Sequence, residues 1–158
     1  MDAKADAARL VTWQPDLRAQ FERLNREWIE RWFVVEDADR TVFADPGARI
    51  VEPGGQIFFV VDEAGVRGTC AMIRHDAETF ELAKMAVEPA AQGRGYGDRL
   101  VEAAVEFARA AGARRIILVS NTVLGPALNL YRKHGFCDVP LDPANGYTRA
   151  DIQLELSL

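Results

Sequence analysis

Three glycines at alternate positions constrain the fold of this chain more than any other feature. Gly93, Gly95 and Gly97 follow an apolar segment that ends at Val87, and they lead directly into an amphipathic segment. Because glycine has no side chain, backbone N–H groups at such positions stay open to a ligand. The start of a helix adds further unpaired N–H groups and a partial positive charge. A strand, a bare loop and a helix N-terminus together predict a site that binds phosphate.

The glycine spacing argues against two nucleotide-binding loops. The mononucleotide P-loop ends in Lys-Ser or Lys-Thr, and neither dipeptide occurs in the chain. The dinucleotide fingerprint has the pattern G-x-G-x-x-G near the start of a strand–helix–strand unit. Here the third glycine comes one residue early and the loop lies past the middle of the chain. A nucleotide-binding module is therefore disfavoured.

The segment 92–97, Gln-Gly-Arg-Gly-Tyr-Gly, resembles the acyl-CoA pyrophosphate loop of the GNAT superfamily of N-acetyltransferases, whose pattern is Q/R-x-x-G-x-G/A. The preceding segment 81–89 resembles the fourth strand of that superfamily. The later segment 127–136 resembles its final helix, written A-x-x-L-Y-x-K-x-G-F. The three segments follow the order of the family, and the resemblance covers roughly residues 8 to 158.

Hydrophobic periodicity predicts one α/β (α+β) domain over residues 1–158, with residues 1–7 as a flexible N-terminus. Predicted strands lie at 8–13, 56–61, 66–74, up to Val87, 114–120 and 152–158, and predicted helices begin at Pro15, Asp37, Gly95 and Pro126. The order β-α-α-β-β-β-α-β-α-β-β is also that of the superfamily. The resemblance therefore implies a mixed, mostly antiparallel twisted sheet of about seven strands flanked by about four helices, with a splayed parallel pair forming the acetyl-CoA cleft.

The resemblance implies that an acetyl group passes from acetyl-CoA to a primary amine by direct attack in a ternary complex. Met85 and Val87 are expected to pair with the pantetheine amides, while a strand N–H group polarises the thioester carbonyl. The implied cofactor-binding residues are Met85, Ala86, Val87, Gln92, Gly93, Arg94, Gly95, Tyr96, Gly97, Asn121 and Tyr131. The alternative is a non-catalytic acyl-CoA sensor that keeps the same loop.

Two residues are candidates for the chemistry. An alkylammonium has a pKa of about 10.4, so forming its neutral amine at pH 7 costs roughly 4–5 kcal/mol, and a base has to assist. Glu81 precedes Gln92 by eleven residues, the offset of the catalytic glutamate in the histone-modifying branch of the superfamily. Glu78 and a chain of waters remain alternatives for the base. Tyr131, the tyrosine of the final-helix pattern, is expected either to protonate the departing thiolate or only to orient the thioester.

The remaining polar candidates are weaker. Asn121 resembles an asparagine found ahead of the final helix, where it either bonds the CoA arm or caps the turn. His75 and His134 show no catalytic spacing and are expected to take no part in the reaction. Cys70 and Cys137 lie in apolar stretches and are predicted to be reduced core thiols. No His, Cys or Asp cluster predicts a metal site.

Charge distribution bears on the partners. The net charge of −5 argues against nucleic acid, but residues 92–134 hold seven basic and three acidic side chains and are suited to CoA. The rest carries −9, which favours a cationic acceptor, either a small molecule or a peptide amine. The family's acceptor regions contribute Glu27, Trp28, Glu30, Trp32, Phe33, Glu36, Asp37, Asp39, Tyr147 and Arg149. These either hold a cationic amine or place the tryptophans in the core and the acids in water, the second being favoured.

Location and assembly are less constrained by the sequence. The longest apolar run, around 56–61, is far too short to span a membrane, and the first residues lack the pattern of a signal peptide. A cytoplasmic protein without a membrane partner is therefore expected. The sequence leaves a homodimer open.

Overall fold

A computed structural model describes residues 8–158, so the expectation of a flexible segment 1–7 lies outside the described residues. Seven strands form one sheet in the order β1-β2-β3-β4-β5-β7-β6. Every neighbouring pair is antiparallel except β4 and β5, which confirms the predicted mixed sheet. The strands are β1 (Arg9–Thr12), β2 (Gln56–Asp62), β3 (Gly65–Arg74), β4 (Thr79–Val87), β5 (Arg115–Ser120), β6 (Cys137–Val139) and β7 (Ile152–Ser157).

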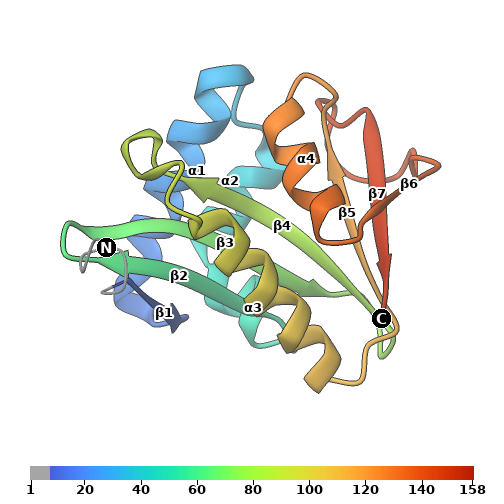
Figure 1. Cartoon of the computed structure of the whole chain (residues 1–158), viewed down its shortest axis with the longest axis horizontal. Helices are drawn as coiled ribbons and strands as arrows, with labels where there is room; N and C mark the ends of the chain where they lie inside the picture. Colours follow the sequence, from blue (N-terminus) through green and yellow to red (C-terminus); the bar gives the residue numbers. More distant parts are fainter. Residues whose placement is uncertain (1–7) are drawn as a thin grey trace.

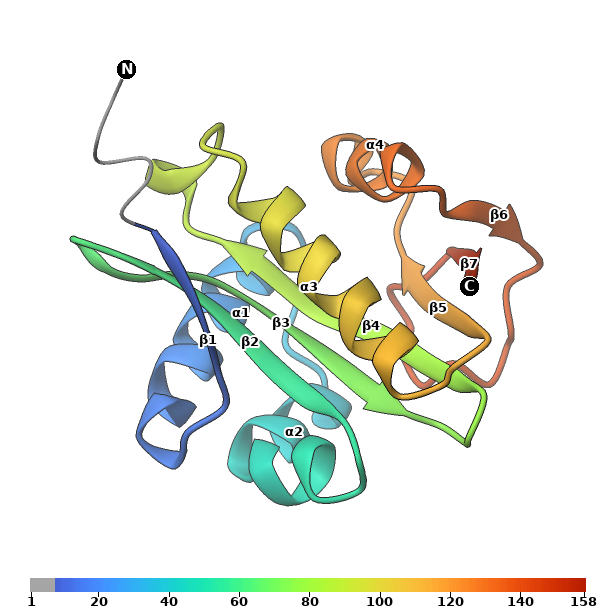
Figure 2. The same ribbon diagram turned by 60° about the horizontal axis from the view of Figure 1, so that its bottom comes forward.

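Helices cover both faces of the sheet. They are α1 (Arg18–Trp32), α2 (Asp37–Ala44), α3 (Tyr96–Ala110) and α4 (Gly125–Lys133). Figures 1 and 2 show α3 and α4 on one face and α1 and α2 on the other. Each face has its own core, since Phe21 of α1 packs edge-on against Phe43 and Phe59, whereas Phe107 of α3 packs against Phe80. A side chain on the sheet therefore belongs to either the α1/α2 face or the α3/α4 face.

Most predicted elements are found, with differences at their ends. The helix predicted over 37–44 has these bounds, but Pro15 opens a single 3₁₀ turn ahead of α1. Pro126 is the second residue of α4 instead of the first. A π-helical turn, Gly47–Val51, follows α2 and was not predicted.

The two cysteines have different environments. Cys70 is fully buried on β3, as predicted, and burial raises the pKa of its thiol. The prediction for Cys137 is wrong, because its side chain is exposed. It lies on β6, which forms one edge of the sheet and packs against a neighbouring strand on one side only.

The parallel pair separates soon after it begins. β4 and β5 share only three residue pairs, from Thr79 opposite Arg115 to Glu81 opposite Ile117. Beyond this point β4 continues beside β3 to Val87, and β5 continues beside β7. Figure 1 shows the two strands meeting near the C-terminus and diverging towards their other ends. The predicted splayed pair is confirmed. Its separation leaves a gap between β4 and β5 that connects the two faces of the sheet.

A bulge interrupts β4 beside this gap. Thr69 of β3 lies opposite Ala86, but Ala71 lies opposite Ala83, so two residues of β4 oppose one residue of β3. The first of the two, Lys84, has a φ of 56°, which L-amino acids rarely adopt. The bulge redirects β4 within the stretch where the strands have separated.

Candidate active site

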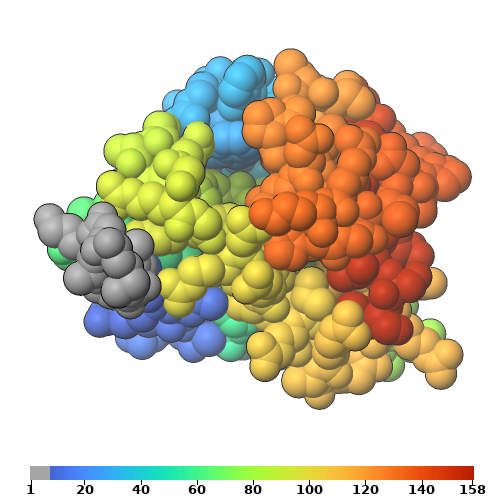
Figure 3. Space-filling model, in the orientation of Figure 1, coloured from blue at the N-terminus to red at the C-terminus, as the bar shows by residue number. Residues whose placement is uncertain are grey.

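A pocket of about 680 Å³ occupies the gap between the separated strands. Its wall is formed by β4 from Glu81 onwards, the end of β5, the start of α3, α4 and the C-terminal half of α1. Figure 3 shows it as a recess bordered by the segment around the end of α1, the loop before α3 and the residues of α4. Ligand sites of enzymes commonly have this size.

Two of the three glycines leave the loop open towards the pocket. Gly93 and Gly95 have φ values of +84° and +81°, and a Cβ atom on either would meet nothing within 4 Å. No described side chain caps the N-terminus of α3, so its first N–H groups are available to a ligand. Gly97 differs, because a Cβ there would lie 3.0 Å from the Leu130 side chain. Its small size serves the contact between α3 and α4.

Buried ion pairs and hydrogen bonds hold both ends of the same loop in place. The Tyr96 hydroxyl donates a hydrogen bond of 2.7 Å to the Asp62 carboxylate, which also pairs with Arg67 at 3.1 Å. Arg67 bonds Glu88, the residue just before the loop, at 2.8 Å. The Arg94 guanidinium lies 3.6 Å from Asp62, and Arg94 is not among the residues that line the pocket. All the other expected cofactor residues line it.

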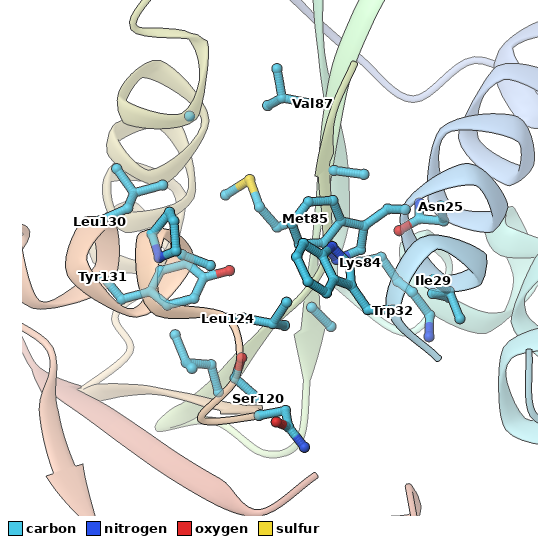
Figure 4. A pocket seen from close by; sticks show the side chains of 18 of the residues that line it. Asn25, Ile29, Trp32, Lys84, Met85, Val87, Ser120, Leu124, Leu130 and Tyr131 are labelled. Carbon is cyan, nitrogen blue, oxygen red and sulfur yellow. The ribbon is translucent and has the colours of Figure 1, made fainter. Parts of the chain in front are cut away.

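Tyr131 extends from α4 into the pocket. Figure 4 shows its hydroxyl directed towards β4, on the side where Met85 and Val87 lie. The residue is only 8% exposed, and no described residue forms a hydrogen bond with the hydroxyl. Burial, together with the nearby Cys70 thiol, raises the pKa of Tyr131. The phenol therefore keeps its proton at neutral pH and can donate it.

Glu81 lies on the opposite face of the sheet from Tyr131. It pairs directly with Ile73 of β3, which packs into the core beneath α1 and α2, and paired residues share one face. Glu81 lines the pocket, and its side chain is 16% exposed. Glu78, the alternative base, does not line the pocket and lies 3.5 Å from Arg114.

Asn121 has both ends of its amide engaged. Its Nδ2 donates to the Arg149 carbonyl at 2.7 Å, and its Oδ1 accepts from the Val123 N–H at 2.9 Å. The side chain therefore caps the turn after β5, one of the two roles expected for it. The second N–H of Nδ2 and the second lone pair of Oδ1 remain for a contact with a CoA arm.

The acids expected to bind a cationic acceptor are already neutralised. Asp39 is fully buried and bonds Lys84 at 2.5 Å and Arg149 at 2.7 and 2.8 Å. Burial opposes its ionisation, but these hydrogen bonds and the charge of Lys84 hold the pKa of Asp39 well below its usual value. Glu36 pairs with Arg149 at 3.4 Å and accepts the Thr148 N–H. The expectation that these two acids lie in water is therefore wrong.

Aromatic side chains dominate the wall around this ion cluster. Trp28 and Trp32 pack edge-on with ring centroids 6.4 Å apart, and Trp32 is 48% exposed at the pocket instead of lying in the core. Arg31 lies over the Trp28 ring, and Tyr147 stacks between Lys84 and Arg149. Sequence patterns missed Lys84 as a member of this site, since only the bulge in β4 brings it to Asp39.

Replacing Asp39 is expected to destabilise the fold strongly. Asp39→Ala leaves the buried Lys84 ammonium without its carboxylate and leaves Arg149 only the longer contact with Glu36, which costs about 3–5 kcal/mol of unfolding free energy at neutral pH. Since the pKa of Asp39 is lowered, its contribution is present above the ordinary value of 3.8 and is lost as the pH falls below it. Urea unfolding at several pH values measures this difference.

The matched control is Asp37→Ala, which removes an exposed acid from the same helix. Asp37 pairs only with Arg40 on the surface, and such pairs contribute less than about 1 kcal/mol. Equal losses for the two variants would contradict the structural role given to Asp39.

Solved structures share this architecture. An acetyltransferase of the GNAT family from Staphylococcus aureus Mu50 superposes with a TM-score of 0.88 at 14% identity, covering 96% of this chain and 99% of that one. A GNAT superfamily phosphinothricin acetyltransferase from Sinorhizobium meliloti, solved in complex with AcCoA, superposes with a TM-score of 0.76 at 20% identity, covering 96% and 89%. At these identities the likeness shows the fold, which is that of the GNAT class of acyltransferases.

Sequence comparison identifies the family. The pattern of the acetyltransferase (GNAT) domain matches residues 53–138, more than half of the chain. The chain therefore belongs to the GNAT acetyltransferase family. The IAA acetyltransferase of Azospirillum brasilense is 36% identical over 83 residues, which are 51% of this chain and 54% of that protein. The chain thus spans about half the length of this curated relative.

Two further features concern partners. Within residues 8–158, no helix combines the length and the apolar character needed to cross a lipid bilayer. In the same range, no group of three or more His, Cys, Asp or Glu side chains is arranged to hold a metal ion.

Proposed function

We propose that residues 1–158 act as a single domain that transfers an acetyl group from acetyl-CoA to a primary amine. The observation that carries this proposal is the pocket between β4 and β5, which connects the two faces of the sheet. The phosphate loop and Tyr131 lie on the α3/α4 face, whereas Glu81 and Trp32 lie on the α1/α2 face. Two substrates can therefore approach one reaction point from opposite sides.

The proposed place of acetyl-CoA follows the α3/α4 face. The N–H groups around Gly93 and Gly95 bind the pyrophosphate, because the space a side chain would fill there is open. The pantetheine arm lies along Met85–Val87, whose partner strand β5 has turned away. The thioester that acetyl-CoA supplies then faces Tyr131. The Sinorhizobium meliloti acetyltransferase of the same fold was solved in complex with AcCoA, which supports acetyl-CoA as the ligand proposed here.

In the proposed reaction the amine attacks the thioester directly. Glu81 removes a proton from the ammonium, and the amine nitrogen bonds the acetyl carbon as the carbon–sulfur bond breaks. Tyr131 protonates the departing sulfur, and the second proton lost by the nitrogen returns to the Tyr131 phenolate, so that one proton in total leaves through Glu81. A covalent acyl-cysteine is disfavoured by the positions of both thiols. Cys70 is buried with its Sγ directed at the Leu100 carbonyl, and Cys137 lies outside the pocket.

The acceptor end favours an amine with a single charge and an apolar body. Asp39 and Glu36 are balanced by Lys84 and Arg149, so little unpaired negative charge remains for a polycation. Trp28 and Trp32 offer an aromatic surface at the same place. Both a small molecule and the amino end of a peptide have this chemistry.

A panel of amines tests this proposal. Free-thiol release from acetyl-CoA is measured with arylalkylamines, amino acids, short peptides, polyamines and aminoglycosides. We expect the aromatic, singly charged amines to give at least about tenfold higher kcat/KM than polyamines, a difference of roughly 1.4 kcal/mol. A clear preference for polyamines would contradict the proposed acceptor end. An intact mass that rises by an acetyl group when acetyl-CoA is added without amine would contradict direct attack.

A further inference from the structure

A histidine outside the pocket contacts the proposed base. His75 Nε2 lies 2.7 Å from Glu81 Oε1, so the two side chains form a hydrogen bond across the β3–β4 hairpin. Glu81 is 16% exposed and faces the pocket, whereas His75 is 44% exposed and faces solvent. Because an ionised carboxylate only accepts hydrogen bonds, His75 carries its proton on Nε2. The imidazole thus holds one oxygen of Glu81, and no described residue forms a hydrogen bond with the other oxygen.

Few other charges act on this pair. Asp76, the next residue in the turn, adds negative charge beside His75. Arg74 donates from Nε to the Asp76 carbonyl, and Arg115 of β5 acts on the Asp76 carboxylate. The hydrogen bond to Glu81 is the main cause that raises the pKa of His75, with the charges of Glu81 and Asp76 adding to it. Protonation of His75 is therefore more favourable than that of a free imidazole.

We propose that His75 is a positioning residue that sets both the orientation of Glu81 and the pH at which Glu81 acts as a base. This inference rests on the proposed role of Glu81. The neutral Nε2–H tautomer fixes the carboxylate and lowers its basicity less than an imidazolium would. When His75 gains a second proton on Nδ1, the imidazolium and Glu81 form an ion pair, which makes the carboxylate a weaker base. Acetyl transfer is present above the pKa of His75 and falls as the pH drops through it.

The pH profile of kcat/KM tests the proposal with three variants. His75→Gln keeps an N–H donor near the Nε2 position but cannot titrate, so the acidic limb of the profile should disappear while activity near pH 8 stays within about threefold. His75→Ala loses the donor and should lower kcat about tenfold with the KM for acetyl-CoA unchanged. His134→Gln is the matched control, since His134 bonds a carboxylate, Asp98, at 2.8 Å elsewhere in the fold. It should keep the acidic limb.

The profile is recorded with two amines whose ammonium pKa values differ by about one unit. A limb due to the acceptor moves with the amine, whereas a limb due to His75 stays in place. An acidic limb that stays in place with both amines and keeps its wild-type position in His75→Gln, or that disappears in His134→Gln, would overturn the proposal.

An NMR titration tests the pair without any turnover. The ring proton signal of His75 should report a raised pKa in the wild-type protein, returning towards about 6.5 in Glu81→Gln. Equal values in both proteins would overturn the pairing. This titration needs no acceptor, so it tests the His75–Glu81 pair independently of acetyl transfer. Failure of the proposed acetyl transfer would instead appear as an absence of thiol release.

Discussion

Tyr131→Phe is expected to lower kcat by about 100-fold or more while the dissociation constant of acetyl-CoA changes less than about threefold. The phenol lies in the pocket with a raised pKa, so it holds its proton until a thiolate forms beside it. The burial that raises the pKa of the phenol also disfavours the charged thiolate beside it, so the sulfur becomes a stronger base in the same surroundings and proton transfer to it stays favourable. Phenylalanine keeps the ring that packs at 6.1 Å from Phe136 and removes only the proton donor.

Three readouts separate an acid from a binding residue. Steady-state thiol release gives kcat, calorimetry gives the affinity for acetyl-CoA, and thermal unfolding shows whether the fold is kept. Equal losses in kcat and affinity would make Tyr131 a binding residue. A better leaving thiol in the acetyl donor should recover part of the lost rate, because it needs less protonation.

Gly95→Ala is expected to weaken acetyl-CoA binding by about 10- to 100-fold. A methyl group at this position meets no protein atom within 4 Å, so it fills only the space proposed for the pyrophosphate. Charge-assisted hydrogen bonds from the loop contribute about 1.5–3 kcal/mol each, and the methyl group keeps the phosphate from reaching them. Calorimetric titration with acetyl-CoA measures the loss.

Gly112→Ala is a closely matched control at the other end of the same helix. Gly112 has a φ of +80° against +81° for Gly95, and its Cβ would also meet nothing within 4 Å. Both variants therefore carry the same backbone strain, about 1 kcal/mol, but only Gly95 lines the pocket. If both variants lose affinity equally, the effect comes from the strain in α3, and the phosphate site lies elsewhere.

The order and type of the strands and helices were predictable from local signals. Helix α2 has its predicted bounds, because Glu36 and Asp39 form a reciprocal cap at its start. The exposed loop at Gly93 and Gly95 was also predictable, since alternate glycines need no tertiary contact to adopt positive φ. The packing of Gly97 against Leu130 was not predictable, because this contact depends on how α3 and α4 meet.

The acceptor end was the part least accessible from sequence. The bulge at Lys84 arises from the pairing of β3 with β4 and leaves no pattern in the residues themselves. It brings Lys84 to Asp39, 45 positions earlier, while Arg149 reaches the same carboxylate from 110 positions later. Counting acids along the chain left open a cationic acceptor site and favoured acids in water, where the fold has formed ion pairs.

The proposed acetyl transfer is tested most directly by measuring acetyl-CoA binding and amine acetylation on one protein preparation. Calorimetry gives the affinity and stoichiometry, and mass spectrometry then follows free CoA and acetylated amine across the panel. We expect one acetyl-CoA binding site per chain and equal amounts of free CoA and acetylated amine for at least one singly charged amine. Binding without transfer to any amine would contradict the enzyme and favour an acyl-CoA sensor. An absence of binding would contradict the proposed phosphate loop itself.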